Sequence, residues 1–583
     1  MRRVGDDLRS RVSWLGLWLV LALLLVLRVA AASRESVNWD EFNLLNHAAW
    51  TAESGVLHSA GRPGLVVLLL GPLAGGCSDE IAVVRAARVL WIGFTGLALA
   101  GLAVLLAQLR PNSPRRWSDA LLGVSLLALV PAFTLWSLQV RTDQVALVGG
   151  LWGGVALIAS RRRPGLAVAA GLLFGLGFLA TQKLVYVGGL VSLLALGEMW
   201  LARDLRPHRE GMRVMLCLAA MGMVVVGFHA MVAQYWMPEG AAVGAADRLT
   251  KGAAASFKQG MGVFEYYRTT IGYSQYIEML PSLLPHLLLG VLLTVTSLRA
   301  LWKGGVVRPR LVLAWSVLLL GLAVGAFHAG AFAYFWMTLG LFPAVALVLA
   351  RDAMEESLAF LPRPALTAGV AAFWLLLALP GVAAMGSLLE DSQRVQRESL
   401  AFTHRNFERG DSGFHPEGGL FCRDAPHRFP NYFSRAINAS FGPASACESC
   451  TWDFINRFEG EQVKFILESY RLHQFPPLVR SFWLDHYVPY RGSVLVAGRR
   501  FGGADAAQSV EFSLVVDGEY LWLPAAREAE IAIDGVSLAR GGRIRLDRGL
   551  HTAHFAGPAP EGLLVLAMSE APGPGLEPFY RQY

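Results

Sequence analysis

The sequence predicts a polytopic α-helical membrane protein of about 11 transmembrane helices, with a C-terminal extracytoplasmic domain of mixed and β-sandwich type. Of the 583 residues, 54% are hydrophobic and 16% are charged, whereas soluble domains carry roughly 25% charged residues. Long apolar segments recur through residues 1–390, many of them close to the roughly 20 residues that cross a bilayer. Residues 391–583 are more polar and alternate apolar with polar side chains in their second half.

The first apolar segment, Trp14–Ala32, is expected to be a retained membrane helix. Its apolar run is too long for a typical signal-peptide core, and it lacks a clear cleavage site. Arg2, Arg3, Arg9 and Arg11 precede it. The positive-inside rule therefore places the N-terminus in the cytoplasm and residue 33 outside.

The basic residues fix the sidedness of the remaining segments. They cluster in short loops at 110–116, 161–163, 203–213, 303–310 and 351–363. This pattern explains the net charge of +7 by membrane topology, and it argues against a nucleic-acid partner. The further predicted spans are 81–109, 120–138, 145–160, 166–180, 184–201, 214–235, 283–298, 311–328, 332–350 and 366–388. The short segment Gly64–Leu73 is bracketed by two prolines, and we expect it to lie along the outer interface.

This topology divides the chain into three parts. Residues 1–390 form a transmembrane domain with a first outer loop at 33–80 and a second at 236–280. Residues 391–490 form an extracytoplasmic mixed α/β segment. Residues 491–583 read as a β-sandwich, because strand-like stretches such as Val510–Val516 and Arg543–Leu546 are separated by Asp-Gly and Gly-Gly turns.

The five cysteines divide in the same way. Cys77 and Cys217 lie in or near membrane segments and are expected to be inert. In an extracytoplasmic domain, Cys422 is expected to pair with Cys447 or with Cys450, which leaves one odd thiol. The Cys447–Cys450 spacing alone is a weak metal signal, because no second pair supplies further ligands.

Several charged residues next to the spans fall on the outer side. They are Asp40, Glu41, His58 and Arg62 in the first outer loop, Arg85 and Arg88 at the start of the second span, Arg141 and Asp143 between the third and fourth spans, and Lys183 between the fifth and sixth. Charges near a bilayer core are costly and are usually paired or functional. Structural readings stay open: the arginines as headgroup anchors, Glu41 as a helix cap, Asp143 as a partner of Arg141, and Lys183 as a turn residue.

The order and shared sidedness of three motifs resemble the C superfamily of polyprenyl-phosphate-dependent glycosyltransferases. The motifs are Trp39-Asp40-Glu41 after the first span, Arg62-Pro63-Gly64 opening the interfacial helix, and Val84-Arg85-Ala86-Ala87-Arg88 starting the second span. Asp143 and Lys183 match an acid after the third span and a lysine after the fifth. The pattern is most similar to protein O-mannosyltransferases and lipid A aminoarabinose transferases, and it covers residues 10–390.

The resemblance implies a membrane glycosyltransferase that moves a sugar from a polyprenyl-phosphate donor to an acceptor outside the cytoplasm, with inversion. Asp40 would be the general base, with Glu41 and Asp143 as further acids of the catalytic site. Basic side chains, with Lys183 and Arg62 foremost, would stabilise the leaving phosphate, and His58, Arg85, Arg88 and Arg141 would complete the donor site. No metal is expected to be obligatory, although a divalent cation is compatible with this chemistry.

The partners implied are the lipid-linked donor, the bilayer, and a glycan, lipid or protein acceptor. Short loops and the cysteine pattern suit a bacterial inner membrane with a periplasmic C-terminal domain. One alternative is a lipid-linked sugar flippase or transporter, which would carry polar residues at mid-membrane depth; here the charges crowd one surface. Another is a non-catalytic glycan-binding membrane assembly protein.

Overall fold

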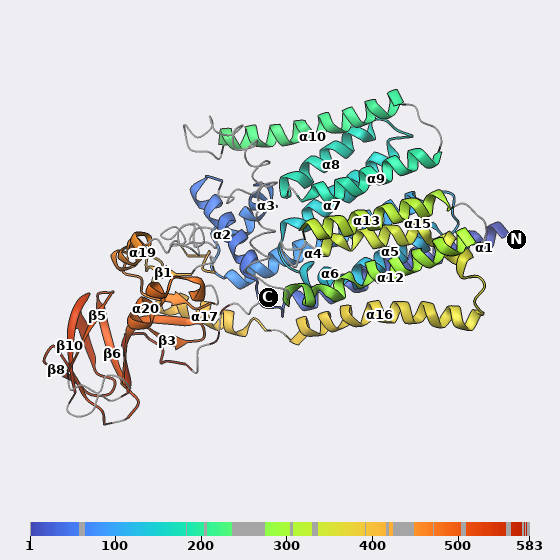
Figure 1. Ribbon diagram of the computed structural model, residues 1–583. Helices are drawn as coiled ribbons and strands as arrows, with labels where there is room; N and C mark the ends of the chain where they lie inside the picture. Colours follow the sequence, from blue (N-terminus) through green and yellow to red (C-terminus); the bar gives the residue numbers. More distant parts are fainter. Residues whose placement is uncertain are drawn as a thin grey trace. The chain divides into compact units, whose positions relative to one another are not determined.

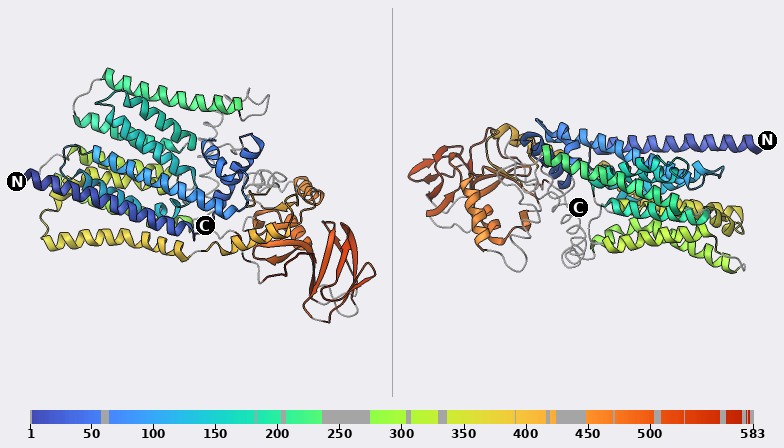
Figure 2. Two further views of the ribbon diagram at one scale, coloured as in Figure 1. Left: turned by 180° about the vertical axis from the view of Figure 1, so that it is seen from behind. Right: turned by 90° about the horizontal axis from the view of Figure 1, so that it is seen from above.

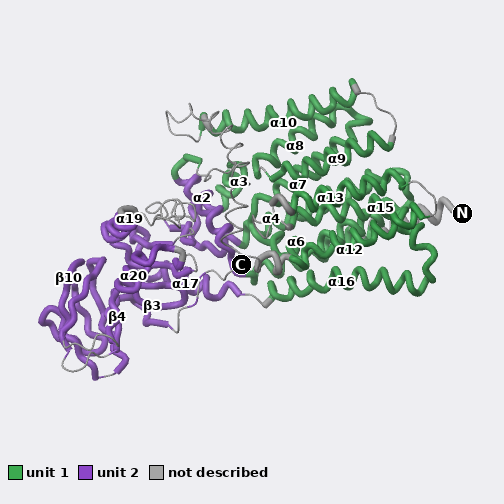
Figure 3. The backbone as a smooth tube through the Cα atoms, viewed as in Figure 1, with its two compact units in different colours: residues 1–35, 54–73, 85–391 green, residues 36–53, 74–84, 392–583 purple. Residues whose placement is uncertain are grey.

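The protein is described from a computed structural model, which forms two compact units (Figure 3). The described residues are 2–57, 64–181, 183–202, 207–235, 274–302, 307–328, 336–390, 392–415, 419–423, 448–469, 472–502, 509–526, 528–555, 561–573, 577 and 579. Unit 1 comprises residues 1–35, 54–73 and 85–391. Unit 2 comprises residues 36–53, 74–84 and 392–583, so parts of the first outer loop belong with the C-terminal region.

Unit 1 is helical, and its long helices run alongside one another (Figures 1 and 2). The helices of unit 1, short ones included, are α1 (Arg2–Ala32), α3 (Leu65–Ala74), α4 (Glu80–Gln108), α5 (Arg116–Leu129), α6 (Pro131–Trp136), α7 (Thr142–Ala159), α8 (Leu166–Ala180), α9 (Leu184–Ala202), α10 (Pro207–Tyr235), α12 (Ser274–Trp302), α13 (Pro309–His328), α14 (Trp336–Leu339), α15 (Leu341–Leu358) and α16 (Arg363–Glu390). Residues 80–84 of α4 are grouped with unit 2.

The prediction of a mainly helical membrane architecture is confirmed. Every predicted span overlaps a helix. In the described part of the chain, seven helices are long and apolar enough to cross a membrane, so the figure of about 11 stays a prediction. Helix α10 exposes Met215, Met223 and Val226, as expected of a helix that meets hydrocarbon. The predicted interfacial segment forms a helix, α3, of ten residues.

The predicted span 120–138 is not one helix. Helix α5 ends at Leu129, and α6 begins at Pro131 after an extended Val130 with ψ 122°. A proline disfavours helical backbone in the residue before it and cannot donate a backbone hydrogen bond. The last residues of the predicted span, Ser137 and Leu138, lie beyond α6 in a turn that leads toward α7.

Small residues let three helices of unit 1 approach closely. Gly149 of α7 faces α8, where an added Cβ would lie 2.6 Å from the carbonyl oxygen of Leu173. Gly171 of α8 faces α10, where a Cβ would overlap the carbonyl oxygen of Cys217. Close backbone approach through small residues is the usual packing mode of membrane helices, so α8 is held between α7 and α10.

A buried ionic cluster joins α5 to α15 at the basic ends of the helices. The Asp119 carboxylate is fully buried, and its Oδ2 lies 2.7 Å from Nη1 of Arg110. It also pairs with Arg351 of α15. Buried charges are tolerated when they are paired. Arg110 and Arg351 come from two of the loops that the sequence analysis places in the cytoplasm, and here they share one carboxylate.

Unit 2 contains helices and two sheets. The helices are α2 (Trp39–Ser54), α17 (Arg394–Asn406), α19 (Glu448–Gly460), the 3₁₀ turn η3 (Leu472–Gln474) and α20 (Pro477–His486). The strands are β1 (Gly413–Phe414), β2 (Phe465–Leu467), β3 (Tyr487–Arg491), β4 (Val494–Phe501), β5 (Ser509–Leu514), β6 (Gly518–Pro524), β7 (Ile531–Ile533), β8 (Val536–Leu538), β9 (Arg543–Leu546), β10 (Gly549–Phe555) and β11 (Gly562–Leu566). One sheet has the order β1-β2-β4-β11-β6-β9 with β3 also on β4, and the other has the order β5-β10-β7-β8.

Aromatic side chains fill the space between the two sheets. Phe501 of β4 lies 5.2 Å from Phe512 of β5 and 5.6 Å from Phe555 of β10, between ring centroids. The predicted sheet-rich C-terminal domain is therefore present. However, β2 pairs with β4 from Phe465 to Leu467, so one sheet runs across residue 490, where the sequence analysis places a domain boundary.

The expected disulfide pairing is wrong. Cys422 bonds to Cys77, 345 residues earlier, with 5.0 Å between the Cα atoms. Cys77 is therefore not an inert residue of the membrane domain but part of unit 2. Local spacing favours the nearby cysteines at 447 and 450, but the fold brings residues 74–84 to the C-terminal region instead. Cys217 is free and buried, as expected.

Candidate active site

Asp40 and Glu41 lie in the first turn of α2, and the two carboxylates have different surroundings. The backbone N–H of Asp40 donates to Oδ1 of Asn38 at 2.9 Å. The backbone N–H of Asn38 donates to Oε2 of Glu41 at 3.1 Å. This reciprocal pattern is a capping box with Asn38 as the N-cap. Glu41 is fully buried, so its carboxylate serves the start of the helix.

Asp40 is also buried, with 6% of its surface exposed. The cap uses only its backbone N–H, while the carboxylate that satisfies the cap comes from Glu41. The helix dipole at a first turn favours a negative charge. The structure thus separates two adjacent acids: one is committed to the helix cap, and the other is held in place by that cap.

In unit 1, Lys183 and Asp143 meet at the ends of helices. Asp143 is in the first turn of α7, and Lys183 lies in the short connection between α8 and α9. The Lys183 Nζ lies 3.3 Å from Oδ1 of Asp143, with side-chain exposures of 23% and 4%. The acid is thus buried beside a partly accessible ammonium group, a favourable arrangement for holding an anion near the lysine.

Arg141, directly before α7, belongs to a buried chain of polar side chains. Its Nε donates to Oε1 of Gln139 at 2.9 Å, and Nε2 of Gln139 donates to Oε1 of Glu35 at 2.7 Å. The guanidinium lies over the Trp136 ring, 4.7 Å from its centroid. The indole N–H of Trp91 donates to the Arg141 carbonyl at 2.5 Å. Gln139, Trp136 and Trp91 therefore contact Arg141 directly, and Glu35 holds Gln139 in turn.

The two arginines of α4 bind the chain just after α1. Arg88 is fully buried; its Nη1 donates to the carbonyls of Ala32 at 2.9 Å and Glu35 at 2.8 Å, and its Nη2 lies 3.8 Å from the Glu35 carboxylate. Arg85 donates to the carbonyl of Ser33 at 3.1 Å. The alternative of a headgroup anchor does not fit Arg88, because its guanidinium is fully buried and donates to the carbonyl of Ala32, the last residue of α1, and to that of Glu35.

The structure thus brings together only some of the predicted site residues. Asp143 pairs with Lys183. Arg88 contacts Glu35 directly, and Arg141 is linked to Glu35 through Gln139. Asp40 and Glu41 lie together on α2 in unit 2. His58 and Arg62 lie outside the described residues, as do residues 236–273 of the second outer loop.

The sequence analysis missed Glu35, Gln139 and Arg28. Arg28 of α1 is fully buried, and its Nε donates to Oγ of Ser137 at 3.0 Å. An arginine inside an otherwise apolar span is itself a signal of function or pairing, and this signal could have been used. No comparable local signal marks Glu35 or Gln139.

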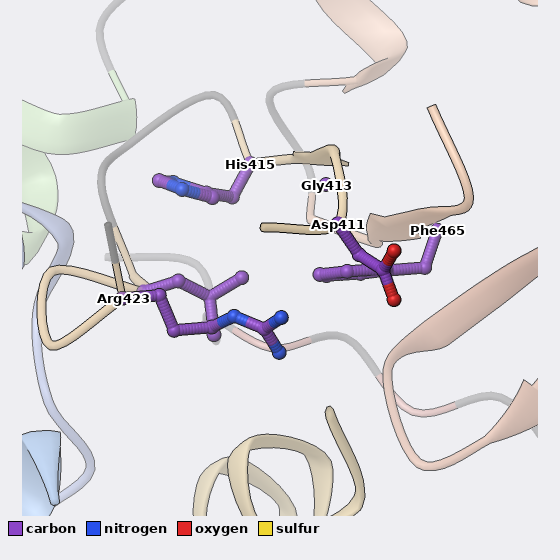
Figure 4. Close-up of a pocket in the computed structure, with 6 residues that line it drawn as sticks. Asp411, Gly413, His415, Arg423 and Phe465 are labelled. Carbon is purple, nitrogen blue, oxygen red and sulfur yellow. The ribbon is translucent and has the colours of Figure 1, made fainter. Parts of the chain in front are cut away.

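Unit 2 has a small pocket of its own (Figure 4). It is lined by Asp411, Gly413, His415, Leu420, Arg423 and Phe465. Arg423 donates to the carbonyls of Thr403 at 2.9 Å and Phe407 at 3.2 Å, and so satisfies the last turn of α17. Burial, together with the Arg423 charge, lowers the pKa of His415 to about 4, so its imidazole is neutral at pH 7. Arg423 is therefore committed to the fold of unit 2.

Within the described residues, no three His, Cys, Asp or Glu side chains gather in a way that could hold a metal ion. At these helix ends, Asp143 contacts Lys183, and Glu35 accepts a hydrogen bond from Gln139.

Comparison with known proteins gives structural likenesses only. No family model matches the chain, and no curated protein matches it. Crystal structures of the Archaeoglobus fulgidus oligosaccharyltransferase align with it: the complex with Zn and sulfate is 11% identical with a TM-score of 0.48, covering 95% of this chain and 98% of that chain. The apo form is 14% identical with a TM-score of 0.42, covering 82% and 74%. The form tethered to an acceptor peptide with the NVT sequon is 10% identical with a TM-score of 0.43, covering 95% and 97%. At these scores the likenesses carry no argument about activity.

Proposed function

We propose that this protein is a membrane glycosyltransferase that transfers a sugar from a polyprenyl-phosphate donor to an acceptor hydroxyl on the extracytoplasmic side. The Lys183–Asp143 pair at the helix ends of unit 1 carries the proposal. Its ammonium group is partly exposed, and Arg141, two residues before Asp143 in the chain, adds a second positive charge for an anionic phosphate. A lipid-linked phosphate must stay near the headgroup plane while its polyprenyl tail remains in hydrocarbon, so helix ends are where its binding groups belong.

In the proposed reaction, the acceptor oxygen attacks the anomeric carbon from the face opposite the phosphate. The bond from that carbon to the phosphate oxygen breaks, and the polyprenyl phosphate leaves with the electron pair. The acceptor proton passes to the carboxylate of Asp40, so the anomeric configuration inverts. A general base of this kind contributes about 10²–10⁴ in rate.

Lys183 is the proposed stabiliser of the leaving phosphate, since an ammonium acts as a compact point charge with three donors. Asp143 orients it from its buried position at 3.3 Å. Arg141 is the second phosphate-binding candidate, held in place by Gln139 and Trp136. Arg88 and Arg85 support this end of unit 1 through the chain that follows α1. His58 and Arg62 remain proposed donor-site residues from the sequence motif.

Glu41, expected from the sequence to be an acid of the catalytic site, has a structural role in the proposal. Its carboxylate closes the helix cap, and we assign it to positioning α2 rather than to the transfer step. No obligatory metal is proposed, because a monophosphate donor held by basic side chains does not require one. A bacterial inner membrane, with the sheet-rich region in the periplasm, and a glycan, lipid or protein acceptor remain part of the proposal.

The test is transfer of radiolabelled sugar from polyprenyl-phosphate sugars in proteoliposomes containing the whole protein. Wild type should transfer label, whereas Asp40→Asn should lose about 10²–10⁴ in rate and keep donor binding. Lys183→Ala should weaken donor binding as well as the rate. Absence of transfer by wild type with every donor tried, together with movement of labelled lipid across the bilayer, would replace this function with that of a flippase.

A further inference from the structure

Helix α2, which carries Asp40, is built into the C-terminal region, and one glutamine joins them. Gln396 of α17 is 2% exposed. The backbone N–H of Val37 donates to its Oε1 at 2.7 Å, and its Nε2 donates to the Val37 carbonyl at 2.8 Å. One side chain therefore satisfies both polar groups of the residue directly before the N-cap of α2.

The side-chain amide of Gln396 also binds the segment around Phe579. Its Nε2 donates to the carbonyl of Phe579 at 3.0 Å, and the Phe579 ring lies 5.6 Å from the ring of Phe42. On another side, Phe42 lies 6.0 Å from Phe421. Phe42 is fully buried and stands two residues after Asp40. The start of α2 is thus held by a buried ring and by hydrogen bonds from α17.

A covalent bond holds the Phe421 side of this arrangement. Cys422, the next residue, is bonded to Cys77, and its backbone N–H donates to Oε1 of Glu80 at 3.2 Å. The other oxygen of the Glu80 carboxylate lies 2.8 Å from Nε2 of His404 on α17. Glu80 is 1% exposed, so its carboxylate links the disulfide to the helix that carries Gln396.

We propose that Gln396 is a positioning residue for Asp40. The Cys77–Cys422 disulfide keeps in place the residues that pack against the start of α2, and the hydrogen bonds of Gln396 to Val37 complete these contacts. The inference rests on the proposed function. Any shift of Val37 moves the N-cap Asn38 and, through the capping box, the Asp40 backbone. Misplacement of a reacting group by about 1 Å can cost about 100-fold in rate. The C-terminal region would then be required for the transfer step itself, beyond any recruitment of acceptor.

The first experiment is a double-mutant cycle in proteoliposomes containing the full chain. Gln396→Met keeps the side-chain length but removes the donor and the acceptor; it should lower kcat by about 10–100-fold and leave donor KM unchanged. In the Asp40→Asn background the same substitution should have less than about a threefold effect, because a residue that acts through Asp40 has nothing left to position. Thr403→Val, a buried change in α17 that removes only hydroxyl bonds within that helix, should leave kcat within about threefold of wild type.

Two readouts separate failure of this inference from failure of the proposed function. Hydrogen exchange at residues 37–45 should speed up in Gln396→Met even if no transfer activity is found. That combination would support the structural role of Gln396 at the start of α2 and would refute only the proposed glycosyltransferase function. Reductant should lower kcat by roughly 10-fold or more in wild type, and equally in a variant that lacks the cysteines at 217, 447 and 450. The variant Cys77→Ser/Cys422→Ser has no such disulfide, so its kcat should already be low and reductant should not lower it further. Equal losses from Gln396→Met in both Asp40 backgrounds, or unchanged exchange at 37–45, would overturn the proposal.

Discussion

Substitutions of Glu41 and of Asp40 should have different effects, because the two acids in the first turn of α2 have different roles. Glu41→Gln keeps an oxygen that can accept from the Asn38 N–H, so the cap loses only the difference between a charged and a neutral acceptor, about 1 kcal/mol. Glu41→Leu leaves that N–H without its partner at a fully buried side chain and should cost about 1–3 kcal/mol of local stability. A loss of about 1 kcal/mol corresponds to about fivefold in rate if it is fully expressed there.

Asp40→Asn should behave differently. It keeps the backbone N–H bond to Asn38 and therefore the cap, but it removes the proposed base, with a loss of about 10²–10⁴ in rate, or about 3–5 kcal/mol. The assay is sugar transfer in proteoliposomes, with hydrogen exchange of α2 measured in parallel. Asp40→Asn should keep full exchange protection of α2 and show little activity. Glu41→Gln should lose no more than about fivefold in rate. If Glu41→Gln loses as much transfer as Asp40→Asn while α2 stays protected, the assignment of the base to Asp40 and of the helix cap to Glu41 is refuted.

Three further outcomes are expected. Asp119→Asn leaves two arginines without their shared buried carboxylate and should lower the free energy of unfolding by about 3–5 kcal/mol, seen as reduced thermal stability in detergent. Gly171→Ala should force α8 from α10 and cost about 1–3 kcal/mol. Gly211→Ala, inside α10 with no atom within 4 Å of the added Cβ, should not lower the melting temperature, because alanine favours a helix more than glycine does. The pKa of His415 falls to about 4 on folding, so the unfolded chain binds the proton more readily between about pH 6.5 and pH 4. Unit 2 should therefore lose stability as pH drops through that window, by up to about 1.4 kcal/mol per pH unit, and His415→Phe should remove that part of the slope in denaturant titrations.

The membrane helices were predictable from the sequence because length and apolar character are local properties. Every predicted span overlaps a helix, and the break at Val130 follows from Pro131, a residue visible in the sequence. The charged residues at helix ends were also visible, as was the capping role of Glu41 as an alternative reading. These features need no knowledge of what lies across the fold.

The partners of those charges were not predictable, because they are distant in the chain. Arg88 meets the carbonyls after α1, 53 and 56 residues away. Gln396 meets Val37 across 359 residues, and Cys77 meets Cys422 across 345. Local spacing favoured a pairing of Cys422 with a nearby cysteine. No local sequence pattern indicates that residues 36–53 and 74–84 of the first outer loop pack with the C-terminal region. A local pattern of residues predicts which face of a helix is buried, but only tertiary packing determines which distant segment covers that face.

The assembly of unit 2 from three separate segments has a consequence for biosynthesis. Cys77 and the residues of α2 leave the ribosome long before Gln396 and Cys422 exist. With 345 residues between the two cysteines and synthesis at about 5–20 residues per second, the first outer loop waits for on the order of a minute without its partners. During that interval Cys77 is an unpaired thiol open to oxidants, and strand β11, the central partner of β4 and β6, is among the last parts to arrive. Chaperones or oxidoreductases that act on nascent chains would therefore meet this protein with its N-terminal loop exposed and its sheet incomplete.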